Sequence, residues 1–116
     1  MEKFGMRLID KKCVPCEGGV KPFSYGEALR YLKFVPSWTI EKGKESKISK
    51  EYKFRDFKQA LKFANKVGAV AESEGHHPNI YIYSWNRLRL TNYTHAIGGL
   101  SENDFILAAK IDQIKK

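Results

Sequence analysis

The pattern of apolar and polar positions predicts an amphipathic helix in the middle of the chain. Between residues 57 and 71 the apolar positions recur at spacings of three and four, which is typical of a helix with one buried side. Asp56 is a suitable N-cap for this helix, and Gly75 suits the left-handed residue that ends it. The predicted buried stripe consists of Phe57, Ala60, Leu61, Ala64, Val67, Gly68 and Ala71.

Two further helices are predicted from their capping residues. A capping box, S-x-x-E, begins at Ser24 and opens a helix that runs to about Lys33, before Pro36 prevents its continuation. Ser101 is the N-cap of the last helix, which runs to about Lys115. The inward positions of this last helix are Phe105, Ala108, Ile111 and Ile114.

Four short runs of apolar and β-branched residues predict strands that form two hairpins. Residues 38–41 and 46–54 make the first pair, and Trp38 is expected in the core. Residues 80–84 and 87–91 make the second pair, and neither run is long enough to indicate a helix. Alternation in the second strand places three residues on one face: Ile48, Tyr52 and Phe54.

The order of these elements is helix, strand, strand, helix, strand, strand, helix. It predicts an α+β fold with two layers, in which a four-stranded antiparallel sheet carries three helices packed on one face. The chain has 116 residues, the length of one domain, so we expect a single domain over residues 1–116. Residues 1–21 form an N-terminal extension that we expect to be extended or irregular.

The second hairpin brings the three histidines of the chain towards one another. His76 and His77 precede its first strand, and His95 follows its second strand. Paired strands lie ~4.8 Å apart, so the outer ends of the hairpin carry these side chains close together. A two-residue turn at residues 85–86 sets His76 opposite His95, whereas a three-residue loop sets His77 opposite His95. Glu72, in the last turn of the preceding helix, can place its carboxylate near His76.

We prefer the three-residue loop, because it groups Ile80 and Ile82 with Leu88 and Leu90 on one apolar face. The other face of the hairpin then carries aromatic side chains. These are Tyr81, Tyr83 and Trp85. A contiguous aromatic surface usually marks an interaction site, so we expect the protein to form an oligomer.

Charge and hydropathy narrow the classes of function. The net charge of +8 favours anionic partners, but the lysines are spread from Lys3 to Lys116, which is typical of solvated faces rather than of a nucleic-acid site. No stretch approaches the ~20 apolar residues of a membrane span, and the N-terminus has no apolar signal region. We therefore expect a cytoplasmic protein.

Cys13 and Cys16 form a C-x-x-C motif that is followed by two glycines. Such a pair can be half of a zinc site or a redox pair. A structural zinc ion needs two more ligands, and the glycines indicate a turn rather than the helix that follows a thioredoxin-like motif. We interpret the motif as part of an N-terminal loop without a catalytic role.

Several residue types recur in a fixed order along the second half of the chain. They are E-x-x-x-H-H-P at residues 72–78, Trp85, T-H at residues 94–95 and G-L-S-x-x-D at residues 99–104. With F-R-D-F at residues 54–57, they resemble the pterin-4a-carbinolamine dehydratase family from about Trp38 to the C-terminus. The C-x-x-C-x-G-G segment is similar to the N-terminal extension of bacterial members. Gly75 departs from relatives with Asp at this position, so that carboxylate contact to the substrate is missing here.

The resemblance implies a hydro-lyase that dehydrates 4a-hydroxytetrahydropterin to quinonoid dihydropterin in tetrahydrobiopterin recycling, without a metal or redox cofactor. The reaction needs one proton delivered to the departing hydroxyl group and another removed from a ring nitrogen. Histidine, with an unperturbed pKa of about 6.5, can do either near neutral pH. We expect His77 and His95 to be the acid–base pair, with His76 holding or assisting.

The resemblance also implies substrate-binding residues around the histidines. Glu72 would orient an imidazole or bind the polar edge of the pterin, or it would be only a solvated charge at a helix end. Pro78 and the backbone groups of Tyr93 and Thr94 would line the pocket. Asp104 fits position N3 of the last helix, where a carboxylate caps free amides, so we expect it to give structural support. The implied partners are the pterin and further copies of the chain, in a homodimer or homotetramer.

Other functions stay open. A three-histidine site would make the chain a hydrolytic zinc enzyme, but adjacent residues on a strand point to opposite faces, which disfavours one ion shared by His76 and His77. A non-catalytic dimerisation or binding module would use the aromatic face, where Arg87 and Arg89 could stack RNA bases. The RNA-recognition signature is absent, so we expect no nucleic-acid partner. The resemblance also allows a pterin-related role in molybdenum-cofactor metabolism.

Overall fold

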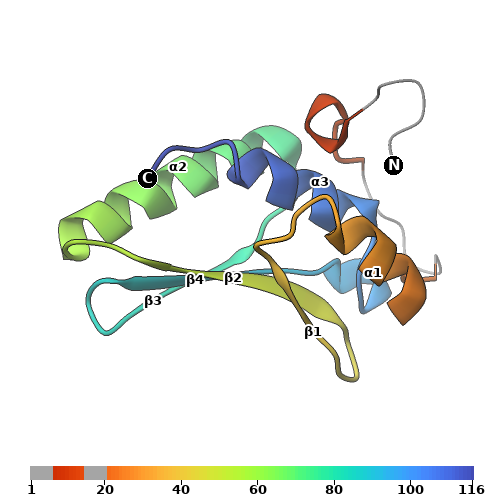
Figure 1. Ribbon diagram of the computed structural model, residues 1–116. Coiled ribbons are helices and arrows are strands. Elements are labelled where there is room, and N and C mark those ends of the chain that lie inside the picture. Colours follow the sequence, from red (N-terminus) through yellow and green to blue (C-terminus); the bar gives the residue numbers. More distant parts are fainter. Residues whose placement is uncertain (1–6, 15–20) are drawn as a thin grey trace.

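The computed structural model describes residues 7–14 and 21–116. Within these residues a four-stranded antiparallel sheet is covered on one side by three α-helices (Figure 1). This arrangement confirms the predicted α+β fold class and the order of its elements. The elements are η2 (Leu8–Asp10), α1 (Tyr25–Leu32), β1 (Thr39–Glu41), β2 (Lys47–Lys53), α2 (Phe57–Glu74), β3 (Asn79–Tyr83), β4 (Arg87–Asn92), η3 (His95–Ile97) and α3 (Glu102–Ile111).

Three helix ends lie at the residues that the sequence indicates. Ser24 accepts a hydrogen bond from the Glu27 amide, and the Glu27 carboxylate accepts one from the Ser24 amide. Asp56 caps α2 through the amide of Gln59 at 2.8 Å. Gly75 ends α2 in the left-handed conformation, with φ of 67°. Local capping therefore sets three of the helix ends without help from the rest of the fold.

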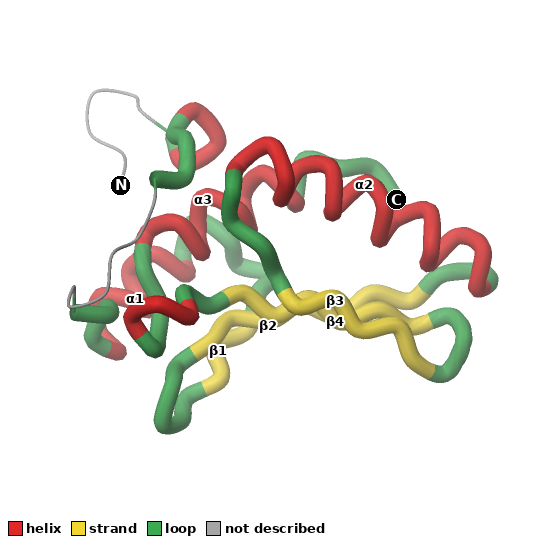
Figure 2. The backbone as a smooth tube through the Cα atoms, turned by 180° about the vertical axis from the view of Figure 1, so that it is seen from behind, coloured by secondary structure: helices red, strands yellow, loops and turns green. Residues whose placement is uncertain are grey.

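The two hairpins join through their inner strands. The strand order is β1-β2-β4-β3, so β2 and β4 lie in the middle of the sheet (Figure 2). Side chains on one face of these strands are fully buried under the helices: Ile48, Leu88 and Leu90. Because side chains alternate across a strand, this confirms the apolar face predicted from the sequence.

The loop of the second hairpin has three residues, but they are residues 84–86 rather than a loop starting at Trp85. Ser84 and Trp85 both have positive φ, of 47° and 56°. Asn86 is buried: its side-chain amide donates to the carbonyl of Phe54 at 2.9 Å, and its carbonyl accepts from the Phe54 amide at 2.8 Å. This contact with the end of β2 places the loop one residue earlier than predicted.

The shifted loop changes the pairing but not the faces. Ile80 pairs with Leu90. Each residue of β3 therefore pairs with a residue two positions earlier in β4 than predicted. Because the shift is an even number of residues, the isoleucines still share a face with the leucines. Pairing of β3 with β4 ends at Asn79 and Thr91. The prediction that His77 lies opposite His95 in the ladder is therefore wrong.

The buried side of α2 differs in part from the predicted stripe. Phe57 and Leu61 are exposed, at 50% and 43% of their surface. Phe63, which the stripe omitted, is buried and packs its ring against Tyr52, with the centroids 4.6 Å apart. The helix carries apolar residues over more than one side, and the rings of Tyr52 on β2 and of Phe54 just after it contact the side that contains Phe63. The residues of α2 that are buried are Ala60, Phe63, Val67 and Ala71.

α3 is shorter than predicted and almost entirely enclosed. It ends at Ile111 rather than near Lys115, and eight of its residues are buried. It packs against α1, α2, η2 and the sheet, which explains why no polar side is needed. Trp38 is buried as predicted, and its ring N–H donates to Asp112 just beyond the end of α3 at 2.9 Å.

η2 corrects the expectation that residues 1–21 are extended or irregular throughout. Residues 8–10 form a single 3-10 turn that packs on α3. The apolar side chain of Leu8 is buried there, and this burial holds the turn in place.

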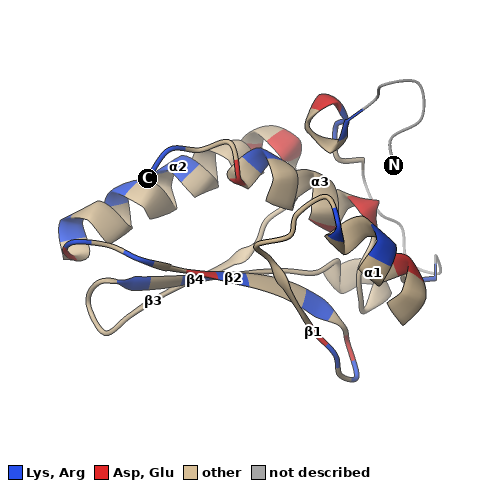
Figure 3. Cartoon of the chain, viewed as in Figure 1, with Lys and Arg blue, Asp and Glu red and all other residues tan. Residues whose placement is uncertain are grey.

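The open face of the sheet carries the predicted aromatic side chains. Tyr81 and Tyr83 stack with their ring centroids 5.1 Å apart, and Trp85 is 61% exposed at the hairpin tip. Beside them, Arg89 forms an ion pair with Glu51 on β2 at 2.7 Å. Lysine and arginine residues are spread over both layers of the described chain rather than gathered at one place (Figure 3).

A substitution at Gly99 would test how tightly residues 21–23 pack on the rest of the fold. A β-carbon at Gly99 would lie 2.7 Å from Cβ of Pro22, which is too close without backbone movement. We expect Gly99→Ala to lower the free energy of unfolding by ~1–3 kcal/mol, measured by urea denaturation. As a control, Gly68→Ala in α2 has no atom within 4 Å and is expected to raise the stability by ~0.4–1 kcal/mol. An unchanged stability of Gly99→Ala would contradict this packing.

Candidate active site

The three histidines surround one open pocket with a volume of about 280 Å³. The link between α2 and β3 contributes His76 and His77, and the segment after β4 contributes His95. The predicted convergence of the histidines is therefore observed, although the strands do not pair as far as these residues. The lining residues are Gly75, His76, His77, Tyr93, Thr94, His95 and Ala96.

Two glycines in the left-handed conformation shape the walls of the pocket. Gly75 reverses the chain at the end of α2, directly before His76. Gly98, with φ of 67°, ends the 3-10 turn that contains His95. Thr94 and Gly99 form an isolated bridge, which closes residues 94–99 into a compact loop. Glycine adopts this conformation at little cost, which explains its use at both turns.

His76 is held by a buried carboxylate. Its Nε2 lies 2.7 Å from Oδ1 of Asp104, whose side chain is completely buried. The other carboxylate oxygen, Oδ2, accepts from the Thr94 hydroxyl at 2.8 Å and from the Ser101 amide at 2.9 Å. With Nε2 of His76 as the donor to this carboxylate, its Nδ1 atom is left as an acceptor. The capping role of Asp104 was predicted, whereas its bond to His76 was not.

Glu72 contacts His77 rather than His76. Its Oε1 lies 2.9 Å from Nε2 of His77, and both side chains are largely exposed, at 82% and 61%. The prediction that Glu72 lies near His76 is wrong, because the turn at Gly75 directs the first histidine towards α3. An exposed pair of this kind contributes little to stability.

His95 has a phenol as its partner. Its Nδ1 lies 3.1 Å from the hydroxyl of Tyr93, and the two rings meet edge to face. The ammonium group of Lys47 on β2 lies 4.8 Å from the centroid of the Tyr93 ring. The sequence indicated backbone groups at Tyr93 and missed this side-chain contact. Pro78 is half-buried next to His77 and does not line the pocket.

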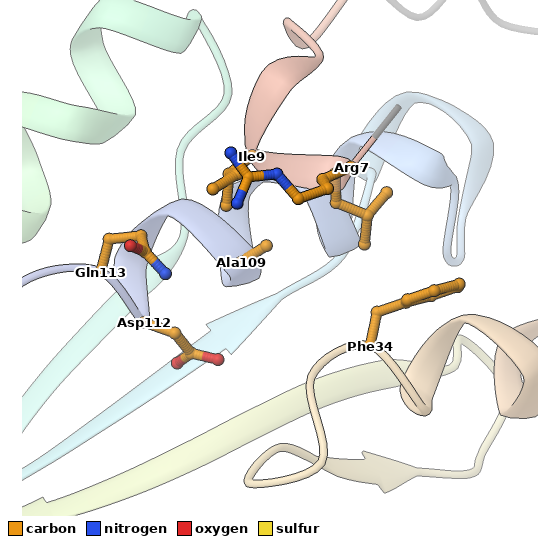
Figure 4. A pocket seen from close by; sticks show the side chains of 7 residues that line it. Arg7, Ile9, Phe34, Ala109, Asp112 and Gln113 are labelled. Carbon is orange, nitrogen blue, oxygen red and sulfur yellow. The ribbon is translucent and has the colours of Figure 1, made fainter. Parts of the chain in front are cut away.

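A second and larger pocket, of about 360 Å³, has a different character (Figure 4). It lies between η2, the end of α1 and the end of α3, and apolar side chains such as Ile9 and Phe34 line it. Its carboxylate, Asp112, already accepts hydrogen bonds from Trp38 and Lys50. None of its lining residues is a histidine.

Cys13 is buried, and its thiol stays protonated near neutral pH. Its thiol is buried and donates to the carbonyl of Asn103 at 3.5 Å. Burial, and then the neighbouring Glu74 carboxylate, raise the pKa of the thiol to about 12. Cys16, the other half of the C-x-x-C motif, lies outside the described residues.

Within residues 7–14 and 21–116, no group of three or more His, Cys, Asp or Glu side chains is arranged to hold a metal ion. In the same residues, no helix is long and apolar enough to cross a membrane.

The sequence model of a family described as pterin 4 alpha carbinolamine dehydratase matches residues 21–114. The chain belongs to this family. A protein of Methylococcus capsulatus, provisionally named a pterin-4-alpha-carbinolamine dehydratase, is 46% identical over 107 residues, which cover 92% of each chain. A protein of Halorhodospira halophila with the same provisional name is 47% identical over 110 residues, covering 94% of this chain and 98% of that one.

Solved structures of related proteins have the same fold. A transcriptional coactivator/pterin dehydratase from Brucella melitensis superposes with a TM-score of 0.71 and 29% identity, covering 79% of this chain and 96% of that one. A pterin dehydratase-like protein, identified as a RuBisCO assembly factor in the alpha-carboxysome, has a TM-score of 0.54 and 26% identity, covering 66% and 86% of the two chains. Proteins similar to the pterin-4a-carbinolamine dehydratases are thus named for more than one function.

The family match includes every residue of the histidine pocket. Glu72, the three histidines and Asp104 lie between residues 21 and 114, whereas the described residues 7–14 precede the match. The buried contacts of this N-terminal segment therefore belong to a part of the chain that the family description does not cover.

Burial of Cys13 predicts a slow reaction of its thiol. In a Cys16→Ser chain at pH 8, we expect iodoacetamide to modify Cys13 at least ~100-fold more slowly in the folded protein than in urea, because the thiolate is the reactive form. The folded pKa of about 12 lies above the ordinary value of 9.0. The stabilisation from the neutral thiol is therefore present below pH 9 and is lost as the pH rises towards 12. Equal rates in the two states would contradict the burial.

Proposed function

We propose that the chain dehydrates a 4a-hydroxytetrahydropterin to the quinonoid dihydropterin and water, as a hydro-lyase of pterin recycling. The carbon–oxygen bond at C4a breaks, the hydroxyl group leaves as water after it receives a proton, and a ring nitrogen loses a proton. No net oxidation or reduction occurs, so this balance requires only proton donors and acceptors. The observation that carries the proposal is the pocket lined by His76, His77 and His95.

The three histidines have different surroundings, which suits them to different roles. His77 and His95 are exposed at the pocket and form the proposed acid–base pair. Each has a polar partner, Glu72 or Tyr93, that orients one ring nitrogen and leaves the other free. An imidazole with a pKa near neutrality can give or take a proton in the transition state, which is worth ~10²–10⁴-fold in rate.

His76 is the proposed binding and orienting residue of the site. Its Nε2–H is committed to Asp104, so its Nδ1 is left to accept a hydrogen bond from the substrate. The exposed carboxylate of Glu72 and the backbone groups of Tyr93 and Thr94 are proposed to bind the polar edge of the pterin, where amino and ring N–H groups need acceptors. Asp104 supports the site from behind and does not touch the substrate.

A second candidate function is a binding module that acts through the open face of the sheet. The stacked tyrosines Tyr81 and Tyr83 and the exposed Trp85 form a surface that favours association with another protein or another copy of the chain. The related RuBisCO assembly factor supports this second reading. A homodimer or homotetramer in the cytoplasm is compatible with both functions.

The dehydration proposal is tested with chemically generated 4a-hydroxytetrahydropterin as the substrate. We expect His77→Ala and His95→Ala each to lower the catalysed rate by ~10²–10⁴-fold while the far-UV circular dichroism stays unchanged. Trp85→Ala is the matched control, because it removes a large side chain at the hairpin tip away from the pocket, and it is expected to retain full activity. Wild-type rates in both histidine variants would remove the proposal.

A further inference from the structure

We propose that Glu74 and Asn103 are positioning residues for His76, and that residues 11–14 link them into a strap behind the pocket. The expected effect on rate rests on the proposed dehydration. The structural part does not: the N-terminal segment sets the separation between the end of α2 and the start of α3. The bond between His76 and Asp104 spans this same separation.

The geometry of the His76–Asp104 pair depends on two elements that are distant in sequence. His76 follows the C-terminal end of α2, and Asp104 lies in the first turn of α3. Their 2.7 Å hydrogen bond therefore lengthens if either helix end moves. Asp104 itself is well fixed, since its carbonyl also accepts from the side chain of Asn92 at 3.0 Å. Contacts that hold the end of α2 in place relative to α3 would therefore also hold His76 in place.

One end of the strap holds the last turn of α2. The ammonium group of Lys12 donates to the carbonyl of Ser73 at 2.8 Å, and the amide of Cys13 donates to Oε1 of Glu74 at 2.9 Å. Oε2 of Glu74 accepts from Lys110 on α3 at 2.6 Å. Glu74 thus bonds to the strap and to α3 at the same time, only two residues before His76.

The charge on Glu74 is maintained although the side chain is 7% exposed. Burial alone would raise its pKa, but the Cys13 amide and the Lys110 ammonium group outweigh it and lower the pKa of this carboxyl. The paired carboxylate is consequently ionised at neutral pH. A buried charge with these partners holds its neighbours in one geometry, because moving them away would leave it unpaired.

The other end of the strap holds the first turn of α3. The amide of Val14 donates to Oδ1 of Asn103 at 3.0 Å, and Nδ2 of Asn103 donates to the carbonyl of Val14 at 2.6 Å. These two hydrogen bonds resemble those between paired β-strands, with the Asn103 side-chain amide in place of the second backbone. Lys11 adds an ion pair with Glu102 at 2.6 Å. Asn103 is buried and is the residue directly before Asp104.

The strap thus contacts both chain segments that carry the His76–Asp104 bond. Helix ends are the parts of a fold that open most easily, and the end of α2 faces the pocket. A displacement of about 1 Å at a catalytic site can cost ~10²-fold in rate. Residues 11–14 lie before the region that the family model matches.

The test compares Asn103→Ala and Glu74→Gln with a control at the opposite end of α3. We expect each variant to lower kcat by ~5–50-fold and to raise KM, because the displaced His76 no longer binds and orients the substrate in the reactive position. The control is Lys50→Met, which breaks the Lys50–Asp112 ion pair at 2.8 Å, also partly buried. It removes a comparable ion pair without touching the strap, and it is expected to retain wild-type kcat.

A nuclear magnetic resonance measurement separates positioning from a general loss of stability. With ¹⁵N-labelled histidine, the Nε2–H proton of His76 is expected to give a protected resonance in the wild type and in Lys50→Met. This resonance should shift and broaden in Asn103→Ala and Glu74→Gln below their melting temperatures. If Asn103→Ala does not fold, Glu74→Gln decides by the same criteria.

The proposal is overturned if both strap variants keep the wild-type resonance, or if their loss of kcat does not exceed that of Lys50→Met. Failure of the function itself looks different. A wild-type chain that does not dehydrate the pterin would remove the enzymatic role, while the response of the His76 resonance to Asn103→Ala would still show whether the strap positions this side chain.

Discussion

The buried carboxylate of Asp104 is the constraint on which the pocket depends. A charge without access to water is stable only when its oxygens accept enough hydrogen bonds. Asp104 accepts from the Ser101 amide, the Thr94 hydroxyl and His76, which come from three separate parts of the chain. One side chain therefore holds together the start of α3, the segment after β4 and the link after α2. These segments meet at the pocket because the same carboxylate requires all three.

The three histidines have different hydrogen-bond partners. His76 is backed by a buried acid, His77 by an exposed acid and His95 by a phenol. The proposed reaction needs a donor, an acceptor and a fixed binding group, and the surroundings differ in the way that these tasks require. The scaffold supplies support on one side, while His77 and His95 are exposed on the other.

The surfaces away from the pocket carry apolar side chains that the isolated chain does not bury. Phe57 and Leu61 lie exposed on α2, and the aromatic surface of Tyr81, Tyr83 and Trp85 lies on the open side of the sheet. Large exposed apolar groups of this kind favour association. The histidine pocket and this aromatic surface share no residue, and related proteins are named for assembly or coactivation as well as for dehydration.

The sequence alone determined the features that depend on neighbouring residues. The cap at Ser24, the cap at Asp56 and the glycine turn at Gly75 follow from hydrogen bonds within a few positions, and the alternation along β2 and β4 follows from strand geometry. These features depend on residues that are close together in the sequence. Their pattern can therefore be recognised before the structure is known.

Only the tertiary structure decided which distant groups became partners. Asn86 moved the hairpin loop because it bonds to Phe54, and Asp104 was joined to His76 across 28 positions. The side of α2 that enters the core was likewise set by the rings of Tyr52 and Phe54, which pack around Phe63. Each of these choices depends on the separation of elements in space. No local pattern records that separation, because it results from packing the whole chain at once.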